Sequence, residues 1–344
     1  MEGNTARVKC VIWDLDNTLW EGTLSEGGAT ALRPGAREAV LELDRRGIVQ
    51  SISSKNDRDA ALRRLKELGL EEYFLCPQIS WDPKSKGVGT VLTALNIKPQ
   101  ATLFVDDTPF ERDEVTHALP KVQTDDGVDL AALLDLPALQ VPFVTADGAK
   151  RRLMYRSDLD RQAAEEVFTG NAEEFLSTLH MKMEVSPVTE GDLQRVEELT
   201  LRTHQLNSTG YTYSYDELLA LSKDPGYIFR ICGLTDDYGD SGKVGLLLME
   251  NAPEALKVKL LIVSCRVMSR GIGSALMCYA TQVAHRLGKP LLAEYLETEF
   301  NRIMYITYKL AGFEEIQEDG ANLLLQFQGT EPLSMPDYLE VSEA

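Results

Sequence analysis

The sequence predicts an α/β protein in two parts: a parallel sheet with helices on both faces, followed by an α+β domain. Two observations lead to this prediction. In the first half, short apolar segments that end at polar residues alternate with amphipathic helical segments. In the second half, apolar segments follow one another in the way that is typical of a mostly antiparallel, meandering sheet. The length of 344 residues also corresponds to about two domains.

The first domain is expected over residues 1–145. Gly47 and Gly69 each follow a predicted helix, as glycine often does at a helix C-terminus. Because ligands of a parallel sheet bind beyond the carboxyl ends of its strands, we expect the site at the polar residues that end these strands. The predicted strands are residues 8–13, 48–52 and 103–105, and the predicted helices are residues 35–46 and 57–68.

A polar, arginine-rich segment over residues 146–180 is predicted to be a helical connector. The second domain is expected over residues 181–330, and residues 331–344 are expected to form a tail. Within the second domain, the predicted strands are residues 183–188, 228–234, 243–250, 256–264 and 322–328, and the predicted helices are residues 191–201, 273–287 and 301–310.

The composition excludes several classes of function. Lys and Arg number 35 against 54 Asp and Glu, a net charge of −19 that disfavours binding to nucleic-acid backbones. A hydrophobic content of 44% excludes a disordered chain, and no uncharged apolar run approaches the roughly 18 residues that span a bilayer. The five cysteines form no CxxC pair, which argues against a zinc site or a disulfide framework. We therefore expect a cytoplasmic protein that binds neither nucleic acid nor a membrane.

The first predicted strand ends in Asp14-Leu15-Asp16-Asn17-Thr18. A carboxylate can attack a phosphoryl group to form an acyl phosphate, and a second carboxylate can protonate the leaving oxygen and then activate water. We interpret Asp14 as the nucleophile and Asp16 as the acid/base, with Asn17 and Thr18 as candidates for binding the phosphate. Taken alone, the motif is also explained by an ordinary turn.

Further candidates follow the later predicted strands. Ser54 could donate a hydrogen bond to a phosphate oxygen, and Lys84 offers a positive charge to the phosphoryl group. Asp106 and Asp107 could complete an Mg²⁺ site with the first two aspartates, because this hard cation prefers carboxylate oxygens. The order Asp, Ser, Lys and Asp-Asp after successive predicted strands is a much stronger signal than the first motif alone.

This ordered set resembles the four motifs of the haloacid dehalogenase (HAD) phosphatase superfamily. The resemblance implies a Rossmann-type, HAD-like sheet with a magnesium-dependent phosphatase site. The short separation between Asp16 and Ser54 leaves little room for a cap domain, and an uncapped site admits a bulky or protein-borne substrate. The residues at the motif positions are Asp14, Asp16, Ser54, Lys84 and Asp107, with Asp106 as a second candidate ligand.

In the second domain, Arg270-Gly271-Ile272-Gly273 opens the helix predicted over residues 273–287. Glycine allows close backbone approach, and free N–H groups at a helix N-terminus bind anions, although a simple helix cap explains these residues about as well. Together with the downstream segment 301–313, this half resembles the GNAT acyltransferase fold, in which a pantetheine arm lies beside splayed strands. Met268 stands where the GNAT loop normally begins with Gln or Arg, which disfavours the use of acetyl-CoA.

Cys265 ends an apolar strand directly before this loop. Arg266 and the nearby helix N-terminus would favour a nucleophilic thiolate, while a plain packing role for the cysteine is also open. His204 is either the general base for Cys265 or a solvated surface histidine, and the sequence leaves both interpretations open. An acidic partner would need basic residues near the loop, and the candidates are Arg202, Arg266, Arg270 and Lys257 or Lys259.

The pairing of the two domains closely resembles the FkbH-like family. That resemblance implies a bifunctional glyceryltransferase/phosphatase of polyketide biosynthesis, which takes a three-carbon unit from 1,3-bisphosphoglycerate, removes its phosphate and loads a glyceryl thioester onto the phosphopantetheine arm of an acyl carrier protein. His204 departs from the Asn usual in the family. The phrases that carry the resemblance are residues 12–20, Ser54-Lys55-Asn56-Asp57, Trp81-Asp82-Pro83-Lys84-Ser85, residues 106–112 and Ser264-Cys265-Arg266-Val267.

Two alternative functions remain open. The chain could be a small-molecule phosphatase fused to an N-acetyltransferase, which the residue at position 268 disfavours. It could also be a non-catalytic module that binds a carrier protein and whose motifs are remnants. The presence of all the HAD motif residues disfavours the second alternative, because a decayed site would have lost at least one of them.

Overall fold

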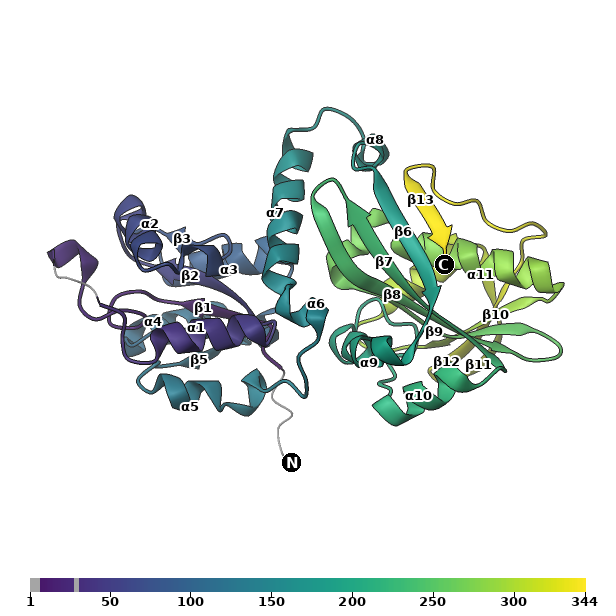
Figure 1. Ribbon diagram of the computed structural model, residues 1–344, viewed down its shortest axis with the longest axis horizontal. Helices are drawn as coiled ribbons and strands as arrows, with labels where there is room; N and C mark the ends of the chain where they lie inside the picture. Colours follow the sequence, from purple (N-terminus) through teal and green to yellow (C-terminus); the bar gives the residue numbers. More distant parts are fainter. Residues whose placement is uncertain (1–6, 28–30) are drawn as a thin grey trace. The chain divides into compact units, whose positions relative to one another are not determined.

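The computed structural model describes residues 7–27 and 31–344 (Figure 1). The chain divides into two compact units, Met1–Asp160 and Arg161–Ala344. The division falls inside helix α7 (Arg151–Val167), within the connector that the sequence predicts. None of the helices in the described residues combines the length and the apolar character needed to cross a membrane.

The first unit is built on a five-stranded sheet with the strand order β3-β2-β1-β4-β5. Every pair of neighbouring strands is parallel, which confirms the predicted parallel sheet. All residues of the three central strands are buried, as expected for a sheet covered on both faces. The strands are β1 (Cys10–Trp13), β2 (Val49–Ser54), β3 (Gln78–Ile79), β4 (Thr102–Val105) and β5 (Gln123–Asp125).

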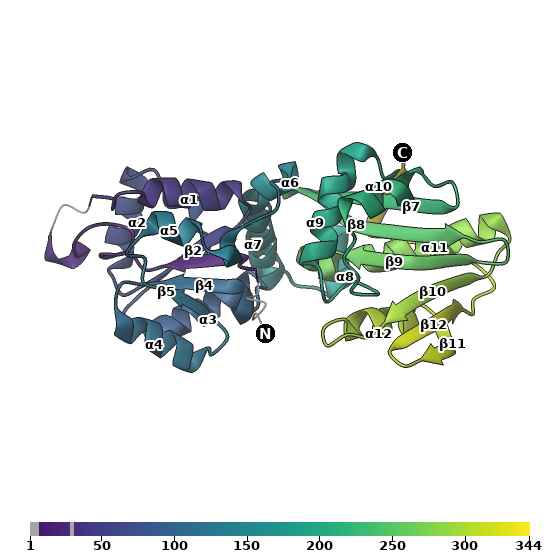
Figure 2. The same ribbon diagram turned by 90° about the horizontal axis from the view of Figure 1, so that it is seen from below.

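Helices cover both faces of this sheet (Figure 2). Val11 and Trp13 point to the face packed by α1, α2 and α5, whereas Cys10 and Ile12 point to the face packed by α3 and α4. This alternation along one strand is the period of two that a sheet imposes. The helices are α1 (Ala36–Arg45), α2 (Arg58–Glu67), α3 (Lys84–Ala94), α4 (Pro109–Ala118), α5 (Leu130–Leu134) and α6 (Ala146–Ala149).

The second unit contains an eight-stranded mixed sheet in the order β11-β12-β10-β9-β8-β7-β6-β13. Its strands pair antiparallel except for β9 with β10 and β6 with β13, which are parallel. The strands are β6 (Met181–Pro187), β7 (Tyr227–Asp236), β8 (Gly239–Asn251), β9 (Leu256–Val263), β10 (Leu291–Leu296), β11 (Phe313–Asp319), β12 (Asn322–Phe327) and β13 (Leu339–Glu343).

The helices of this unit also pack on opposite faces of their sheet. Helices α9 and α10 bury the side of the sheet that carries Leu260 and Ile262, and α11 buries the side that carries Leu261 and Val263. Residues Cys265–Arg270 form a short 3-10 segment, η6, between β9 and α11. The helices are α8 (Ala172–Ser177), α9 (Leu193–Arg202), α10 (Tyr215–Lys223), α11 (Ile272–Leu287) and α12 (Arg302–Leu310).

Strands β9 and β10 pair over only three positions, from Leu256 with Leu291 to Val258 with Ala293. Beyond that point residues 206–208 lie between the two strands. The backbone N–H of Ser208 donates to the carbonyl of Leu261 at 3.0 Å, and its carbonyl accepts from Leu296 at 3.1 Å. The opening between the two strands is therefore filled by a segment of the protein itself.

Residues 331–344, expected as a tail, include a strand of the sheet. Strand β13 pairs with β6 from Leu339 opposite Met181 to Glu343 opposite Val185. Most of its residues are charged or exposed, so its hydrophobic pattern is too weak to reveal it. The sequence analysis also missed β3, β5, β10 and β11. Two of these are very short, and β11 is exposed apart from its first residue and more than half acidic.

Candidate active site

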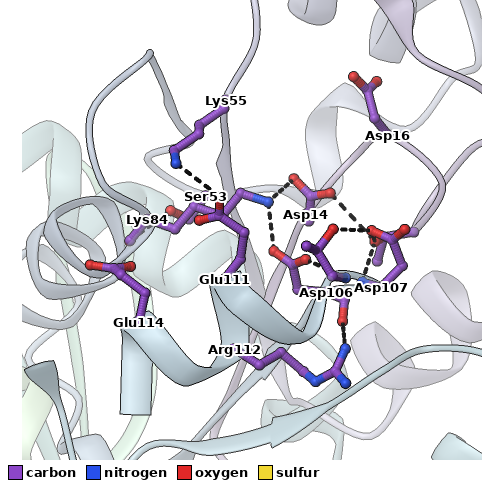
Figure 3. A network of polar contacts seen from close by, with 12 residues as sticks. Asp14, Asp16, Ser53, Lys55, Lys84, Asp106, Asp107, Glu111, Arg112 and Glu114 are labelled. Atoms are coloured by element: carbon purple, nitrogen blue, oxygen red, sulfur yellow. Dashed lines mark hydrogen bonds and ion pairs between the residues drawn. The ribbon is translucent and has the colours of Figure 1, made fainter. Parts of the chain in front are cut away.

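Three carboxylates meet beyond the carboxyl ends of two neighbouring strands. Asp14 directly follows β1, while Asp106 and Asp107 follow β4, which pairs with β1 in parallel. One oxygen atom from each of the three carboxylates lies within 4.8 Å of the others (Figure 3). Adjacent parallel strands end at the same edge, so loops far apart in sequence become neighbours there.

Lys84, the first residue of α3, lies between two of these carboxylates. Its Nζ is 2.8 Å from Oδ1 of Asp14 and 2.5 Å from Oδ2 of Asp106. The side chains of Lys84 and Asp14 are each 6% exposed and that of Asp106 is 0% exposed. Burial of charges is tolerated when they are paired, and this lysine pairs with both buried carboxylates.

The negative charge of the cluster exceeds the positive charge. Burial raises the pKa of the Asp14 carboxyl to about 6, with a further contribution from Asp106, and against the opposing effects of Lys84 and Ser54. Three carboxylates face one ammonium group, so a divalent cation would neutralise the remaining charge. The donor atoms are all carboxylate oxygens, the type that Mg²⁺ prefers, and the residues therefore fit this ion.

Thr18 is fully buried and connects the loop after β1 with the loop after β4. Its hydroxyl lies 3.4 Å from Oδ2 of Asp14 and 3.4 Å from Oδ1 of Asp107, and it accepts a hydrogen bond from the backbone N–H of Asp107 at 3.1 Å. These contacts orient two carboxylates of the cluster. In this structure Thr18 therefore positions carboxylates, whereas the sequence predicts a contact with phosphate.

Asp16 and Asn17 do not join the cluster. Oδ1 of Asp16 accepts hydrogen bonds from Nε1 of Trp20 at 2.7 Å and from the backbone N–H of Leu24 at 3.2 Å, and Figure 3 shows its carboxylate apart from the other three. Asn17 is exposed in a left-handed conformation and accepts from the backbone N–H of Gly22. The prediction that the Asp16 side chain is a metal ligand is thus not met by this arrangement, because a nearby indole N–H holds the carboxylate.

The sequence analysis missed several residues at the rim of the site. The Nζ of Lys55 is 2.8 Å from Oε1 of Glu111, and Arg112 donates to the backbone carbonyl of Asp106 at 2.6 Å. Glu114 accepts hydrogen bonds from the backbone N–H and the hydroxyl of Ser85, which joins α4 to α3. A proline at the first position of a helix is a common start signal, so Pro109 could have placed these residues beside the aspartates.

In the second unit, half-buried Cys265 begins η6 and is separated from the end of β9 by Ser264. Gly271 follows η6 in a left-handed conformation, with φ of 74°, and begins α11 as its N-cap. A side chain at this position would also collide with the ring of Tyr338. The predicted glycine loop is therefore present, and its first glycine is covered by an aromatic side chain. Gly273 faces the side chain of Val263.

The two arginines predicted beside this loop bind inside the unit. Arg270 is buried, and its Nη1 lies 3.0 Å from the hydroxyl of Ser241 and 3.5 Å from Oδ2 of Asp236. Nη2 of Arg266 donates to the backbone carbonyl of Ser241 at 2.9 Å. A buried guanidinium requires polar partners, and the hairpin of β7 and β8 supplies them from the last residue of β7 and from β8. The expected anion-binding role of Arg270 is therefore replaced by an internal ion pair.

His204 is exposed, and its ring centroid lies 6.3 Å from that of Phe300. Downstream of it, the carbonyl of Leu206 accepts from the backbone N–H of Val263 at 2.9 Å. The two segments run antiparallel. His204 lies two residues before Leu206, and Cys265 lies two residues after Val263, so both residues are at the same end of this pairing. Their positions in the fold keep open the interpretation of His204 as a base for Cys265.

Comparisons with known proteins agree with the first part of this description. Residues 25–111 match the haloacid dehalogenase-like hydrolase family. No curated protein matches the chain. The first unit therefore contains a HAD-like hydrolase domain, as the order of the motifs predicts.

Solved structures resemble each part of the chain. The N-terminal part of a Bacteroides fragilis protein, which contains a phosphatase domain and is complexed with Mg, is 29% identical with a TM-score of 0.36, and the match covers 40% of this chain and 42% of that chain. The PaiA N-acetyltransferase of Thermoplasma acidophilum, in complex with coenzyme A, is 15% identical with a TM-score of 0.34, over 44% of this chain and 99% of that chain. The ribosomal-protein-S18-alanine N-acetyltransferase of Escherichia coli is 16% identical with a TM-score of 0.34, and the match covers 44% of this chain and 95% of that chain.

Proposed function

We propose that the protein is a cytoplasmic, bifunctional glyceryltransferase/phosphatase. It would take a phosphoglyceryl unit from 1,3-bisphosphoglycerate, remove the remaining phosphate and load the glyceryl thioester onto the phosphopantetheine arm of an acyl carrier protein for polyketide biosynthesis. The observation that carries most weight is the buried cluster of Asp14, Lys84, Asp106 and Asp107 in a HAD-like hydrolase domain.

In the phosphatase reaction, the carboxylate of Asp14 attacks phosphorus and the ester oxygen leaves as the alcohol. Water then hydrolyses the acyl phosphate, which releases phosphate and restores the carboxylate. Asp14, Asp106 and Asp107 would hold Mg²⁺, whose charge offsets that of the phosphoryl oxygens. Protonation of the leaving oxygen by Asp16 requires its carboxylate to exchange Trp20 for the substrate.

In the transfer reaction, Sγ of Cys265 attacks the acyl carbon of the donor and phosphate leaves, which forms a thioester. The thiol of the carrier arm then attacks this thioester, and the cysteine is released as a thiol. Cys265 is half-buried and lies two residues beyond the end of β9, which makes its sulfur the candidate nucleophile. His204 is the candidate base for this step.

The segment between β9 and β10 favours this route over the N-acetyltransferase alternative. In the GNAT fold that the second unit resembles, the pantetheine arm lies beside the splayed strands, and here residues 206–208 fill that opening. Asn301 fixes the segment further, because its Nδ2 donates to the carbonyl of Asn207 at 3.0 Å. Direct use of acetyl-CoA in the GNAT manner would need this segment to leave.

The surface of the second unit offers a place where the carrier protein itself could dock. A cleft of about 640 Å³ lies over β9, β10 and β12, beside residues 209–213. Lys257 and Lys259 line it, as do Tyr211 and Tyr213, and Nζ of Lys259 lies 2.5 Å from Oε1 of Glu294. Since Arg266 and Arg270 are engaged internally, these two lysines and Arg202 remain the candidates for contact with an acidic carrier.

Two exposed aromatic side chains support a large substrate at the phosphatase site. Trp81 and Phe110 are 69% and 70% exposed, and they lie three residues from Lys84 and Asp107 respectively. Aromatic side chains provide large contact areas for an approaching partner. A phosphorylated group carried on a protein-borne arm would pass these side chains on its way to Asp14.

The experiment that tests the proposal is intact-mass analysis after incubation with 1,3-bisphosphoglycerate and a phosphopantetheinylated carrier protein. The expected result is a carrier that gains a glyceryl group without phosphate. A carrier of unchanged mass, together with acetylation of an amine substrate by acetyl-CoA, would establish the N-acetyltransferase alternative. An unchanged carrier without phosphate release from any donor would instead favour the non-catalytic module.

A further inference from the structure

The side chain of Asn56 is buried without the hydrogen bonds that a buried amide requires. Asn56 is 2% exposed, and neither Oδ1 nor Nδ2 has a hydrogen-bond partner within residues 7–27 and 31–344. Most buried amide groups in folded proteins are paired, because an unpaired donor or acceptor loses its contact with water and gains nothing. The two polar atoms of Asn56 therefore suit a ligand.

The position of Asn56 brings it to the edge of the sheet that holds the carboxylate cluster. It lies two residues beyond the end of β2, whose Ile52 pairs with Trp13 at the end of β1. Asp14 follows that pair directly. Asp57, the next residue, is the N-cap of α2 and accepts from the backbone N–H of Ala60 at 2.8 Å, which fixes the loop on the other side.

A second unpaired group lies close to this loop. Lys55, the neighbour of Asn56, forms an ion pair with Oε1 of Glu111. The other carboxylate oxygen of Glu111, Oε2, is buried and has no hydrogen-bond partner in the described part of the chain. Figure 3 shows Lys55 and Glu111 beside the cluster that contains Asp14. Polar atoms without a partner thus occur next to Lys55 in the sequence, on Asn56, and on Glu111, the partner of Lys55.

We propose that Asn56 forms a subsite for a hydroxyl group on the carbon next to the phosphorylated carbon of the substrate. Oδ1 accepts from this hydroxyl, and Nδ2 donates to the ester oxygen or to a phosphate oxygen beside it. A carboxamide presents an acceptor and a donor side by side, which matches a vicinal hydroxyl and phosphate. The inference rests on the proposed phosphatase function and adds the residue that would recognise the hydroxyl of a phosphoglyceryl substrate, Asn56.

The activity test compares two substrates that differ only in the hydroxyl. With full-length protein, kcat/KM is measured for 3-phosphoglycerate and for 3-phosphonooxypropanoate. A site built to bind a substrate hydroxyl rejects the analogue that lacks it, so we expect a preference of about tenfold or more for 3-phosphoglycerate. In Asn56→Ala this preference should fall to about threefold or less. An equal preference in both proteins would overturn the proposal.

A stability test separates a ligand-binding amide from a structural one. Gln50 on β2 is the matched control, because its Oε1 accepts from Nε1 of Trp13 at 3.0 Å and its Nε2 donates to the carbonyl of Val40 at 2.8 Å. Gln50→Leu should lower the melting temperature by several degrees, whereas Asn56→Leu should leave it unchanged or raise it. A fall for Asn56→Leu that matches the control would show that the amide has an internal structural role, which contradicts the proposal.

The outcomes distinguish this inference from the function on which it rests. If Asp14→Asn abolishes phosphate release while the substrate preference does not depend on Asn56, the phosphatase stands and the subsite is refuted. If the protein with its natural sequence hydrolyses neither ester in the presence of Mg²⁺, both fail. Loss of the preference in Asn56→Ala, with an unchanged melting temperature for Asn56→Leu, would support both.

Discussion

In the first unit Asp14, Lys84 and Asp106 meet at one buried site, whereas in the second unit Arg266 and Arg270 turn to partners inside the domain. The two regions start from similar sequence signals, since in each a polar loop follows an apolar strand. In the parallel sheet, the loops after neighbouring strands share one edge, so their side chains converge. In the mixed sheet, the loop after β9 adjoins the hairpin of β7 and β8, which carries acceptors of its own.

A charged residue in a motif indicates a functional site when its nearest partners belong to the same motif. Lys84 is paired with two motif carboxylates, and the surplus negative charge there suits a cation. Arg270 is paired with Asp236, which also pairs with Arg161, so the guanidinium of Arg270 is engaged inside the second unit.

The largest effect is expected for Asp14→Asn. This change keeps the shape of the side chain and removes the nucleophile, so phosphate release should fall by roughly 10⁴-fold or more. Release of inorganic phosphate in excess Mg²⁺ is the measurement. Labelling of Cys265 by a thiol reagent serves as the control and should not change, because that residue lies in the other unit. Release at the normal rate would refute the N-terminal site.

Cys265→Ser should abolish acyl transfer while phosphate release from a simple ester continues. A serine hydroxyl is far less nucleophilic than a thiolate at neutral pH, and we expect transfer to fall roughly 10³-fold. The intact mass of the protein, taken after brief exposure to 1,3-bisphosphoglycerate without carrier, reports the intermediate. A mass gain that survives in Cys265→Ser, or that maps to another cysteine, would mean that Cys265 is not the acyl carrier.

Lys84→Met should destabilise the first unit and make its stability depend on Mg²⁺. Removal of one partner from a buried ion pair costs about 3–5 kcal/mol, and here two carboxylates lose their cation. Added Mg²⁺ should recover part of this loss, because the three carboxylates of the cluster remain. Thermal unfolding with Mg²⁺ and with excess chelator measures the effect. Equal melting temperatures in the two conditions would argue against a metal site at the cluster.

The smallest effects are expected for Arg270 and for the cleft residues Lys257 and Lys259, whose variants should differ in stability and in the rate of carrier loading. Arg270→Met should cost about 3 kcal/mol in stability and leave the salt dependence of carrier loading unchanged, since the arginine is buried in an internal pair. Lys257→Glu with Lys259→Glu should instead slow loading a few-fold at low salt, with stability changed by no more than about 1 kcal/mol. Loading rates across a salt series decide between them, and the opposite assignment of effects would reverse the roles given to these residues.

Much of the fold could be predicted, because the decisive signals are local. Strands such as β1 and β2 are short apolar segments buried on both faces, and helices such as α2 begin at a side-chain cap like Asp57. The meeting of Asp14 with Asp106 and Asp107 could also be expected, because each follows a predicted strand of a parallel sheet. These features depend on neighbours in sequence or on a topology that the alternation of strands and helices specifies.

The rest depended on partners that the sequence does not announce. The carboxylate of Asp16 accepts a hydrogen bond from the indole N–H of Trp20, four residues further along the chain. The sequence does not show which partner this carboxylate takes. That the side-chain amide of Asn56 is buried without a hydrogen-bond partner among the described residues can be seen only in the structure. Likewise, nothing in residues 206–208 indicates that they fill the opening between β9 and β10, since that requires the splay of two distant strands.

Strand β13 has a consequence for how the second unit is made on the ribosome. Its partner β6 is synthesised roughly 150 residues earlier, and at about 5–20 residues per second this interval lasts on the order of 10–30 s. Until β13 emerges, the outer edge of β6 has no strand to pair with, while the first unit has long been available to fold. Neighbouring nascent chains on one messenger RNA can compete for that edge, so the rate of translation influences the yield of correctly assembled protein.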